Sequence, residues 1–205
     1  MNEAVLGYVT WSRELRITPF MRWYGEEKIF DFRSLRDKQE AGFHHFYTCN
    51  VSLKTAFLRT YGQFDEDFKT AAFEDIDLGY RLSKNGLRLF YNAKAIAYHY
   101  QSFSFADACR KTCGNAAAAR LFFSKECGQS VMEEIREKQS LLQYRIGKPI
   151  AIGVAAALAP MRKLLDSSFP MPGIVYHLFF WNDATRTKSA RKHFDRLMRT
   201  TGRRE

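Results

Sequence analysis

Three carboxylates, Glu74, Asp75 and Asp77, gather within four positions at the start of a predicted helix. Crowded carboxylates repel one another, so such a cluster needs a reason. One reason is chemistry, because a positioned carboxylate can take the proton of a reacting hydroxyl group as a general base. The other is structural: acids in a first helical turn complement the unpaired N–H groups and the helix dipole, each by about 0.3–1 kcal/mol.

The helix that carries these acids is predicted over residues 74–85, where Leu78 and Leu82 recur on one face and an Asn-Gly pair supplies a C-terminal stop. At about 100° per residue, Asp75 points away from the side shared by Glu74 and Asp77. We expect an acid at a helix N-terminus to keep a low pKa, which favours the ionised form that a base requires.

Other segments must hold this helix in place. Four of them have the β-branched and aromatic composition of strands: residues 4–11, 46–53, 87–91 and 95–100. The second runs into a short helix over residues 54–61, and residues 18–32 read as irregular, punctuated by Pro19 and Gly25. After residue 101 the pattern becomes helical, and Ser104 followed by Asp107 indicates a capping box.

Five short pieces in this order, "CNVSLK", "YGQFDEDF", "EDIDLGYRL", "NGLRLFY" and "AIAYHY", resemble family 2 glycosyltransferases of the GT-A fold, with galactosyltransferase-like C-terminal motifs. The likeness extends over about residues 4–125. It implies an α/β fold: an incomplete GT-A mixed sheet, followed by a helical C-terminal extension. It also implies an inverting, metal-assisted transfer of a sugar from a nucleotide-sugar donor to a glycan or lipid-linked acceptor.

The resemblance also implies roles for single residues. Asp75 matches the base that deprotonates the acceptor hydroxyl, and Glu74 matches its partner near the acceptor. Thr48, Cys49 and Asn50 match the substrate-binding loop beside the donor sugar, although many relatives carry glycines there.

One further residue concerns the metal. His99 matches a histidine that helps to ligate a divalent ion, Mg²⁺ or Mn²⁺, on the donor diphosphate in the complete enzyme. From the residues alone, a lone histidine in a strand is structural more often than not. Arg81, on the same helix as the acids, is predicted to be an ion-pair partner in preference to a phosphate contact.

The nucleotide-binding first half of the family, which ends in a D-x-D motif, has no counterpart in this sequence. Three explanations stay open: the chain is a fragment, the first half comes from another chain, or this is a decayed relative. We therefore predict three parts: an acceptor-side half-domain over residues 1–100, a helical extension over 101–145, and an apolar segment with a basic tail over 146–205.

The third part leaves two other classes of function open. The apolar run 149–161 is too short to span a bilayer, for which about 20 residues are needed, but it suits either a buried helix or an anionic membrane surface. The tail 186–204 has eight basic residues and one acid, Asp195, and accounts for most of the net charge of +10. The alternatives are thus a non-catalytic membrane-associated partner and, with less support, a nucleic-acid binder, since no stacking platform accompanies the tail.

Composition and cysteine usage indicate the compartment. An apolar content of 46% is ample for a folded core. The four cysteines show no CxxC pair and no zinc-like pattern with histidine and read as reduced thiols, and the first residues do not resemble a signal peptide. We expect a cytoplasmic protein, with a peripheral position on the inner face of the membrane as a further possibility.

Overall fold

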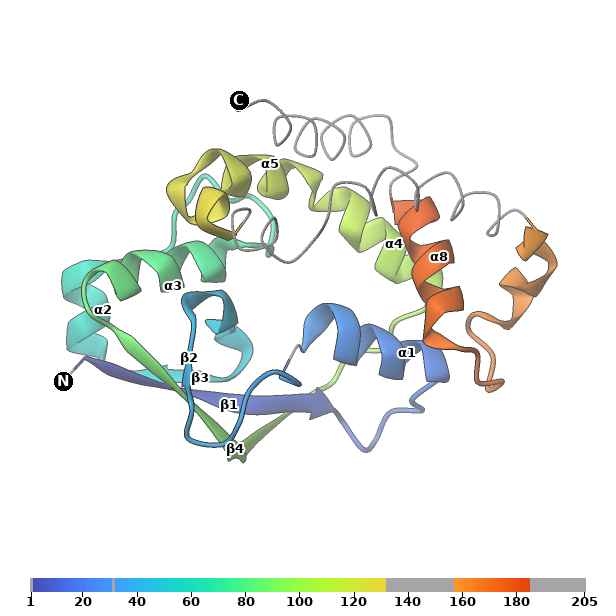
Figure 1. Cartoon of the computed structure of the whole chain (residues 1–205), viewed down its shortest axis with the longest axis horizontal. Helices are drawn as coiled ribbons and strands as arrows, with labels where there is room; N and C mark the ends of the chain where they lie inside the picture. The colour runs from blue at the N-terminus through green and yellow to red at the C-terminus, as the bar shows by residue number, and fades with distance from the viewer. Residues whose placement is uncertain (1, 31, 132–156, 185–205) are drawn as a thin grey trace, which may run out of the picture.

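The structure, a computed structural model, describes residues 2–30, 32–131 and 157–184 (Figure 1). The helices and strands follow one another in this order: β1 (Glu3–Trp11), α1 (Pro19–Tyr24), the π-helical turn η1 (Gly25–Ile29), β2 (Glu40–Ala41), the 3-10 turns η2 (Phe43–His45) and η3 (Thr48–Asn50), β3 (Val51–Leu53), α2 (Thr55–Tyr61), α3 (Glu74–Lys84), β4 (Arg88–His99), α4 (Phe105–Gly114), α5 (Ala116–Ser124), the 3-10 turn η4 (Ala159–Leu164) and α8 (Gly173–Ala184).

The strands form one four-stranded mixed sheet in the order β2-β4-β1-β3. The two central strands, β1 and β4, run parallel, while β3 pairs antiparallel with β1 and β2 antiparallel with β4. A parallel pair requires a crossover connection, and α3 lies within the one that joins β1 to β4. The prediction of an α/β chain, with a sheet in the first hundred residues and helices after it, is confirmed.

The helices cover one face of this sheet. Figure 1 shows them on the same side of the strands, with α2 and α3 toward one end of β1 and α1 toward the other. Along β4, Leu89 and Tyr91 are buried against the helices, whereas Ile96 and Tyr98 point to the other face and are each 51% exposed. The period-2 alternation of a strand thus separates a core face from a face that the described residues leave open.

Helix α3 packs closely on the core face. Leu78 and Leu82 are buried in the main hydrophobic cluster, as their spacing predicts. A side chain on Gly79 would approach the Cβ of Phe46 to 2.4 Å, so only glycine lets η2 lie this close to the helix. The helix ends before Gly86, whose φ of +85° suits glycine. Its boundaries agree with the prediction to within one residue.

The two strands predicted over 87–91 and 95–100 are a single strand, β4. The pairing with β1 shifts in the middle: Gly7 lies opposite Asn92, but the next residue, Tyr8, lies opposite Ile96. Residues 93–95 therefore have no partner on β1. This bulge interrupts the sequence pattern of one continuous strand, which is why the pattern reads as two.

Two other segments differ from the prediction. Only Val51–Leu53 of the stretch 46–53 is a strand, because Thr48–Asn50 forms a 3-10 turn before it. The stretch 18–32 is largely helical: α1 begins at Pro19, and the Oγ1 of Thr18 accepts the N–H of Met21 at 3.1 Å as an N-cap. A Thr-Pro pair is a recognised start signal, so this helix was readable from the sequence.

The C-terminal helices pack on α1. The predicted capping box opens α4, where Ser104 and Asp107 bond each other's backbone N–H groups. The ring of Tyr176 in α8 lies 5.5 Å from that of Trp23 and 5.7 Å from that of Phe20. Within the described ranges, no helix combines the length and apolarity needed to cross a membrane. Most of the apolar run 149–161, and the basic tail, lie outside the described residues.

Candidate functional site

The three carboxylates at the start of α3 have three different environments. Asp77 is 2% exposed, and its carboxylate lies 2.9 Å from Nε of Arg81 and 3.3 Å from Nζ of Lys125. The predicted role of Arg81 as an ion-pair partner is confirmed. Asp77 is thus a structural acid whose charge is neutralised by ion pairs with Arg81 and Lys125, and it does not lie on a solvated helix face.

Asp75 has no cationic partner among the described residues, in contrast to Asp77. Burial and, after it, the neighbouring Glu74 carboxylate raise the pKa of Asp75 to about 6. Backbone N–H groups of Ile76, at 2.9 Å, and of Thr48 oppose this shift without cancelling it. The expectation of a low pKa is therefore wrong: desolvation and the charge of Glu74 outweigh the local effect of the helix N-terminus.

Glu74 has an unusual feature of its own. Its Oε2 atom is buried and has no hydrogen-bond partner among the described residues. A buried acceptor that lacks a donor costs free energy comparable to a lost hydrogen bond, about 1–3 kcal/mol, and more when it is charged. Such an atom is suited to accept a hydrogen bond from a ligand.

The residue that precedes these acids is also strained. Phe73 adopts the left-handed conformation, with φ of +69°, and provides no side-chain cap for the helix. A left-handed non-glycine residue costs about 1–2 kcal/mol. Its ring stacks on that of Phe122 at 5.0 Å, which offsets part of this cost. Sequence reasoning missed Phe73, because its conformation depends on a ring almost fifty positions later.

The structure brings the 3-10 turn Thr48–Asn50 beside Asp75. The backbone N–H of Thr48 donates to the Asp75 carboxylate. Burial and, after it, the charge of Asp75 raise the pKa of the Cys49 thiol. The Nδ2 of Asn50 instead points into the β1–β4 bulge, where it donates to the carbonyl oxygens of Tyr8 at 3.0 Å and Ala95 at 2.8 Å. Of the three residues predicted to bind substrate, Asn50 thus has a clear structural task.

His99 lies at the end of β4, on the core face of the sheet. Its ring lies 5.5 Å from that of Trp11 and 5.6 Å from that of Phe30. Burial and, after it, Lys111 lower its pKa, which favours the neutral imidazole that binds metals. Within the part of the chain that the structure describes, His99 makes no hydrogen bond or ion pair with Glu74, Asp75 or residues 48–50.

The divalent ion that the resemblance implies does not find a complete set of ligands here. Among the described residues, no group of three or more His, Cys, Asp and Glu side chains is placed to hold a metal. His99 supplies one candidate ligand, whereas a site of defined geometry needs several.

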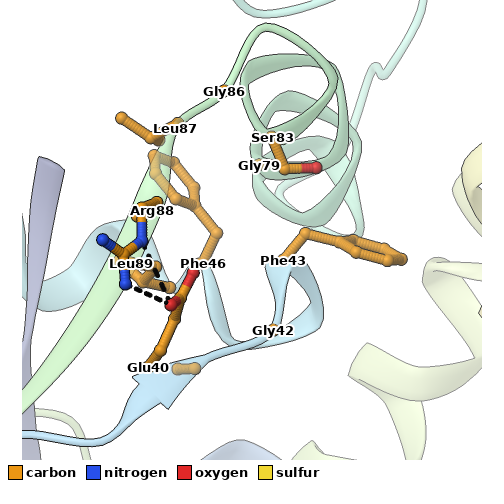
Figure 2. Close-up of a pocket in the computed structure, with 11 residues that line it drawn as sticks. Glu40, Gly42, Phe43, Phe46, Gly79, Ser83, Gly86, Leu87, Arg88 and Leu89 are labelled. Atoms are coloured by element: carbon orange, nitrogen blue, oxygen red, sulfur yellow. Dashed lines mark hydrogen bonds and ion pairs between the residues drawn. The ribbon is translucent and has the colours of Figure 1, made fainter. Parts of the chain in front are cut away.

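A pocket of about 350 Å³ lies away from these residues, between β2, the start of β4 and the second half of α3. Figure 2 shows the ion pair of Arg88 with Glu40 on one side of it, and Gly79 and Ser83 of α3 on another. The two charged side chains that line it form an ion pair with each other, with 2.8 Å between Nη2 of Arg88 and Oε2 of Glu40. Neither Glu74 nor Asp75 lines this pocket, so the candidate chemistry belongs to the first turn of α3.

The first turn of α3 and the turn at Thr48–Asn50 thus combine three groups: a carboxyl group of raised pKa, a buried carboxylate oxygen without a partner among the described residues, and the thiol of Cys49. Cys49 keeps surface accessible to solvent, although its surroundings desolvate the thiol enough to raise its pKa. Perturbed titratable groups of this kind concentrate at functional sites. No family model, no curated protein and no solved structure matches the chain.

Proposed function

We propose that the chain is the acceptor-side half of a family 2 glycosyltransferase, in which Asp75 is the general base. The observation that carries the proposal is how Asp75 is held: backbone N–H groups of Ile76 and Thr48 bond its carboxylate, no described cation pairs with it, and burial raises its pKa to about 6. A base with this pKa is mostly ionised at neutral pH and accepts a proton more readily than an ordinary aspartate. The five motif pieces around it, in their order, add the resemblance to the GT-A fold.

The proposed reaction is a single displacement. The oxygen of the acceptor hydroxyl forms a bond to the anomeric carbon of the donor sugar. At the same time the bond from that carbon to the diphosphate oxygen breaks, and the nucleoside diphosphate leaves with the electron pair. The hydroxyl proton passes to the Asp75 carboxylate. Attack opposite the leaving group inverts the configuration at the anomeric carbon.

Glu74 would orient the acceptor in this scheme. Its buried Oε2, without a partner among the described residues, can accept a hydrogen bond from a second hydroxyl of the acceptor. Its charge also contributes to the raised pKa of Asp75. The two adjacent acids therefore have different roles: Asp75 accepts the proton, and Glu74 binds the acceptor.

The test is an assay of sugar transfer with a panel of nucleotide sugars. The chain would be assayed alone and together with a polypeptide that supplies a nucleotide-binding half with a D-x-D motif. We expect transfer in the second case alone, because no motif of this chain matches a donor-binding half. Robust transfer by the chain alone would contradict the half-domain proposal, and no transfer with any supplied half would contradict the transferase proposal.

A further inference from the structure

The end of α5 and the residues just after it contact the first turn of α3 at two points, one on each side of the candidate base. At the first point, the ring of Phe73 stacks on Phe122, with centroids 5.0 Å apart and planes at 23°. Phe123 lies 6.0 Å from the same ring. Phe73 is the strained residue just before Glu74, so these rings hold the backbone where the helix begins.

The second point is Asp77, two residues after Asp75. Its carboxylate pairs with Lys125 at 3.3 Å, and the thiol of Cys127 donates to it at 3.5 Å. Lys125 also pairs with Asp65, which ties the loop before α3 into the same network. Both Asp77 and Cys127 are almost fully buried, which makes this a fixed contact and distinguishes it from a surface ion pair.

These two contacts bracket Glu74 and Asp75. We infer that residues 122–127 position the first turn of α3 for catalysis, and that Phe122 and Lys125 are positioning residues for Asp75. The inference rests on the proposed function, in which Asp75 is the base. Under this inference, the segment after residue 101, predicted as a helical extension, contributes positioning residues to the candidate site.

The physical reason lies in how Asp75 is held. It has no ion pair of its own among the described residues, so its side chain is held by backbone N–H groups, those of Ile76 in the first turn and of Thr48 in η3, and both contacts depend on where the first turn lies. If residues 122–127 lose their contacts with α3, the strain at Phe73 favours a rearrangement of the first turn of the helix. The carboxyl group of Asp75 then gains access to water. Hydration stabilises the carboxylate form and lowers its pKa.

The experiment is an NMR titration of the Asp75 side-chain carboxyl carbon in the full 205-residue chain. Two variants break one contact each: Phe122→Leu shortens the stacked ring, and Lys125→Met removes the ion pair. We expect the pKa of Asp75 to fall by about one pH unit in both variants. The amide spectrum of each variant verifies that the chain is folded.

The direction of the pKa shift of Asp75 distinguishes a positioning role of Lys125 from a direct effect of its charge. Loss of the Lys125 charge alone would raise the pKa of Asp75, because a cation favours the carboxylate form. Phe122→Leu changes no charge at all. The control is Lys94→Met, which removes an exposed lysine of β4 that has no contact with residues 122–127 among the described interactions. It should leave the pKa of Asp75 in place.

An Asp75 pKa that is unchanged or raised in either Phe122→Leu or Lys125→Met would overturn the inference, as would a fall of equal size in Lys94→Met. The titration needs no substrate. A failure of the transferase proposal, seen as lack of transfer, is therefore distinguishable from a failure of the positioning inference.

Discussion

The side chain of Asn50 occupies the space that Gly7 leaves open between β1 and β4. Its Nδ2 bonds the carbonyl oxygens of Tyr8 and Ala95, and a Cβ on residue 7 would come within 2.2 Å of that atom. The amide thus donates hydrogen bonds to two carbonyl groups at the bulge, where the pairing of β1 with β4 is interrupted. It also anchors the turn that carries Thr48 and Cys49 beside Asp75.

The first prediction concerns this anchor. Gly7→Ala should displace the Asn50 amide and lower the free energy of unfolding by about 1–3 kcal/mol, measured by chemical denaturation. Gly114→Ala is the matched control, because a side chain there meets nothing within 4 Å at the end of α4. It should be neutral or slightly stabilising. Equal stability of Gly7→Ala and the wild type would show that Asn50 has no such role.

The second prediction concerns pH. The pKa of folded Asp75, about 6, lies above its ordinary value of 3.8. The folded chain therefore binds more protons than the unfolded chain between these values, and this contribution to stability is lost as pH rises through the window. Asp75→Asn should not show this loss. From pH 4 to pH 7, the variant should gain on the order of 2–3 kcal/mol in free energy of unfolding relative to the wild type.

Denaturation curves at several pH values measure this difference. Asp67→Asn is the control, because Asp67 is exposed and lies outside the candidate site. It removes a carboxyl group elsewhere and should not reproduce the pH-dependent gain of Asp75→Asn. A pH-independent difference for Asp75→Asn would show that the carboxyl group titrates like an ordinary aspartate.

The third prediction tests the proximity of Asp75 to Cys49. The charge of Asp75 is the second cause, after burial, of the raised pKa of the Cys49 thiol. Removal of that charge in Asp75→Asn should increase the thiolate fraction, and alkylation of Cys49 at pH 8 should become about two- to fivefold faster. Mass spectrometry of the Cys49 peptide gives the rate, with Asp67→Asn as the control. An unchanged rate would mean that the two groups do not interact.

The fourth prediction concerns the strained residue before the site. Phe73→Ala loses the ring stacking and keeps the left-handed conformation, whereas Phe73→Gly loses the stacking but relieves the strain. The glycine variant should therefore be the more stable of the two by about 1 kcal/mol, measured by thermal or chemical unfolding. The reverse order would indicate that residue 73 leaves the left-handed region in the variants.

The sequence predicts well those features that depend on near neighbours. The start of α3 at Glu74 and its stop at Asn85-Gly86 follow from local signals, as does the capping box of Ser104 with Asp107. The continuity of β4 does not, because the bulge opposite Gly7 is a property of pairing between strands. Local pattern alone cannot show which residues of a strand have lost their partner.

The same division holds at the candidate site. The spacing of the three acids separates Asp75 from Asp77 in direction, but it does not say which of them is neutralised. That depends on Lys125, which lies 48 positions from Asp77 along the chain and reaches it only through the packing of the segment after α5 on α3. The pKa of Asp75 likewise depends on its burial in the folded chain, which the local argument leaves out, and that argument therefore gave the wrong direction.

The central claim is that Asp75 is the general base, and turnover of the Asp75→Asn variant tests it most directly. Sugar transfer would be measured as kcat and kcat/KM against pH, in the chain completed by a donor-binding half. We expect turnover of the variant to fall by about 10²–10⁴-fold with little change in KM, and kcat/KM of the wild type to fall below a pH of about 6. Unchanged turnover in Asp75→Asn would contradict the claim and leave the carboxylates with a structural role alone.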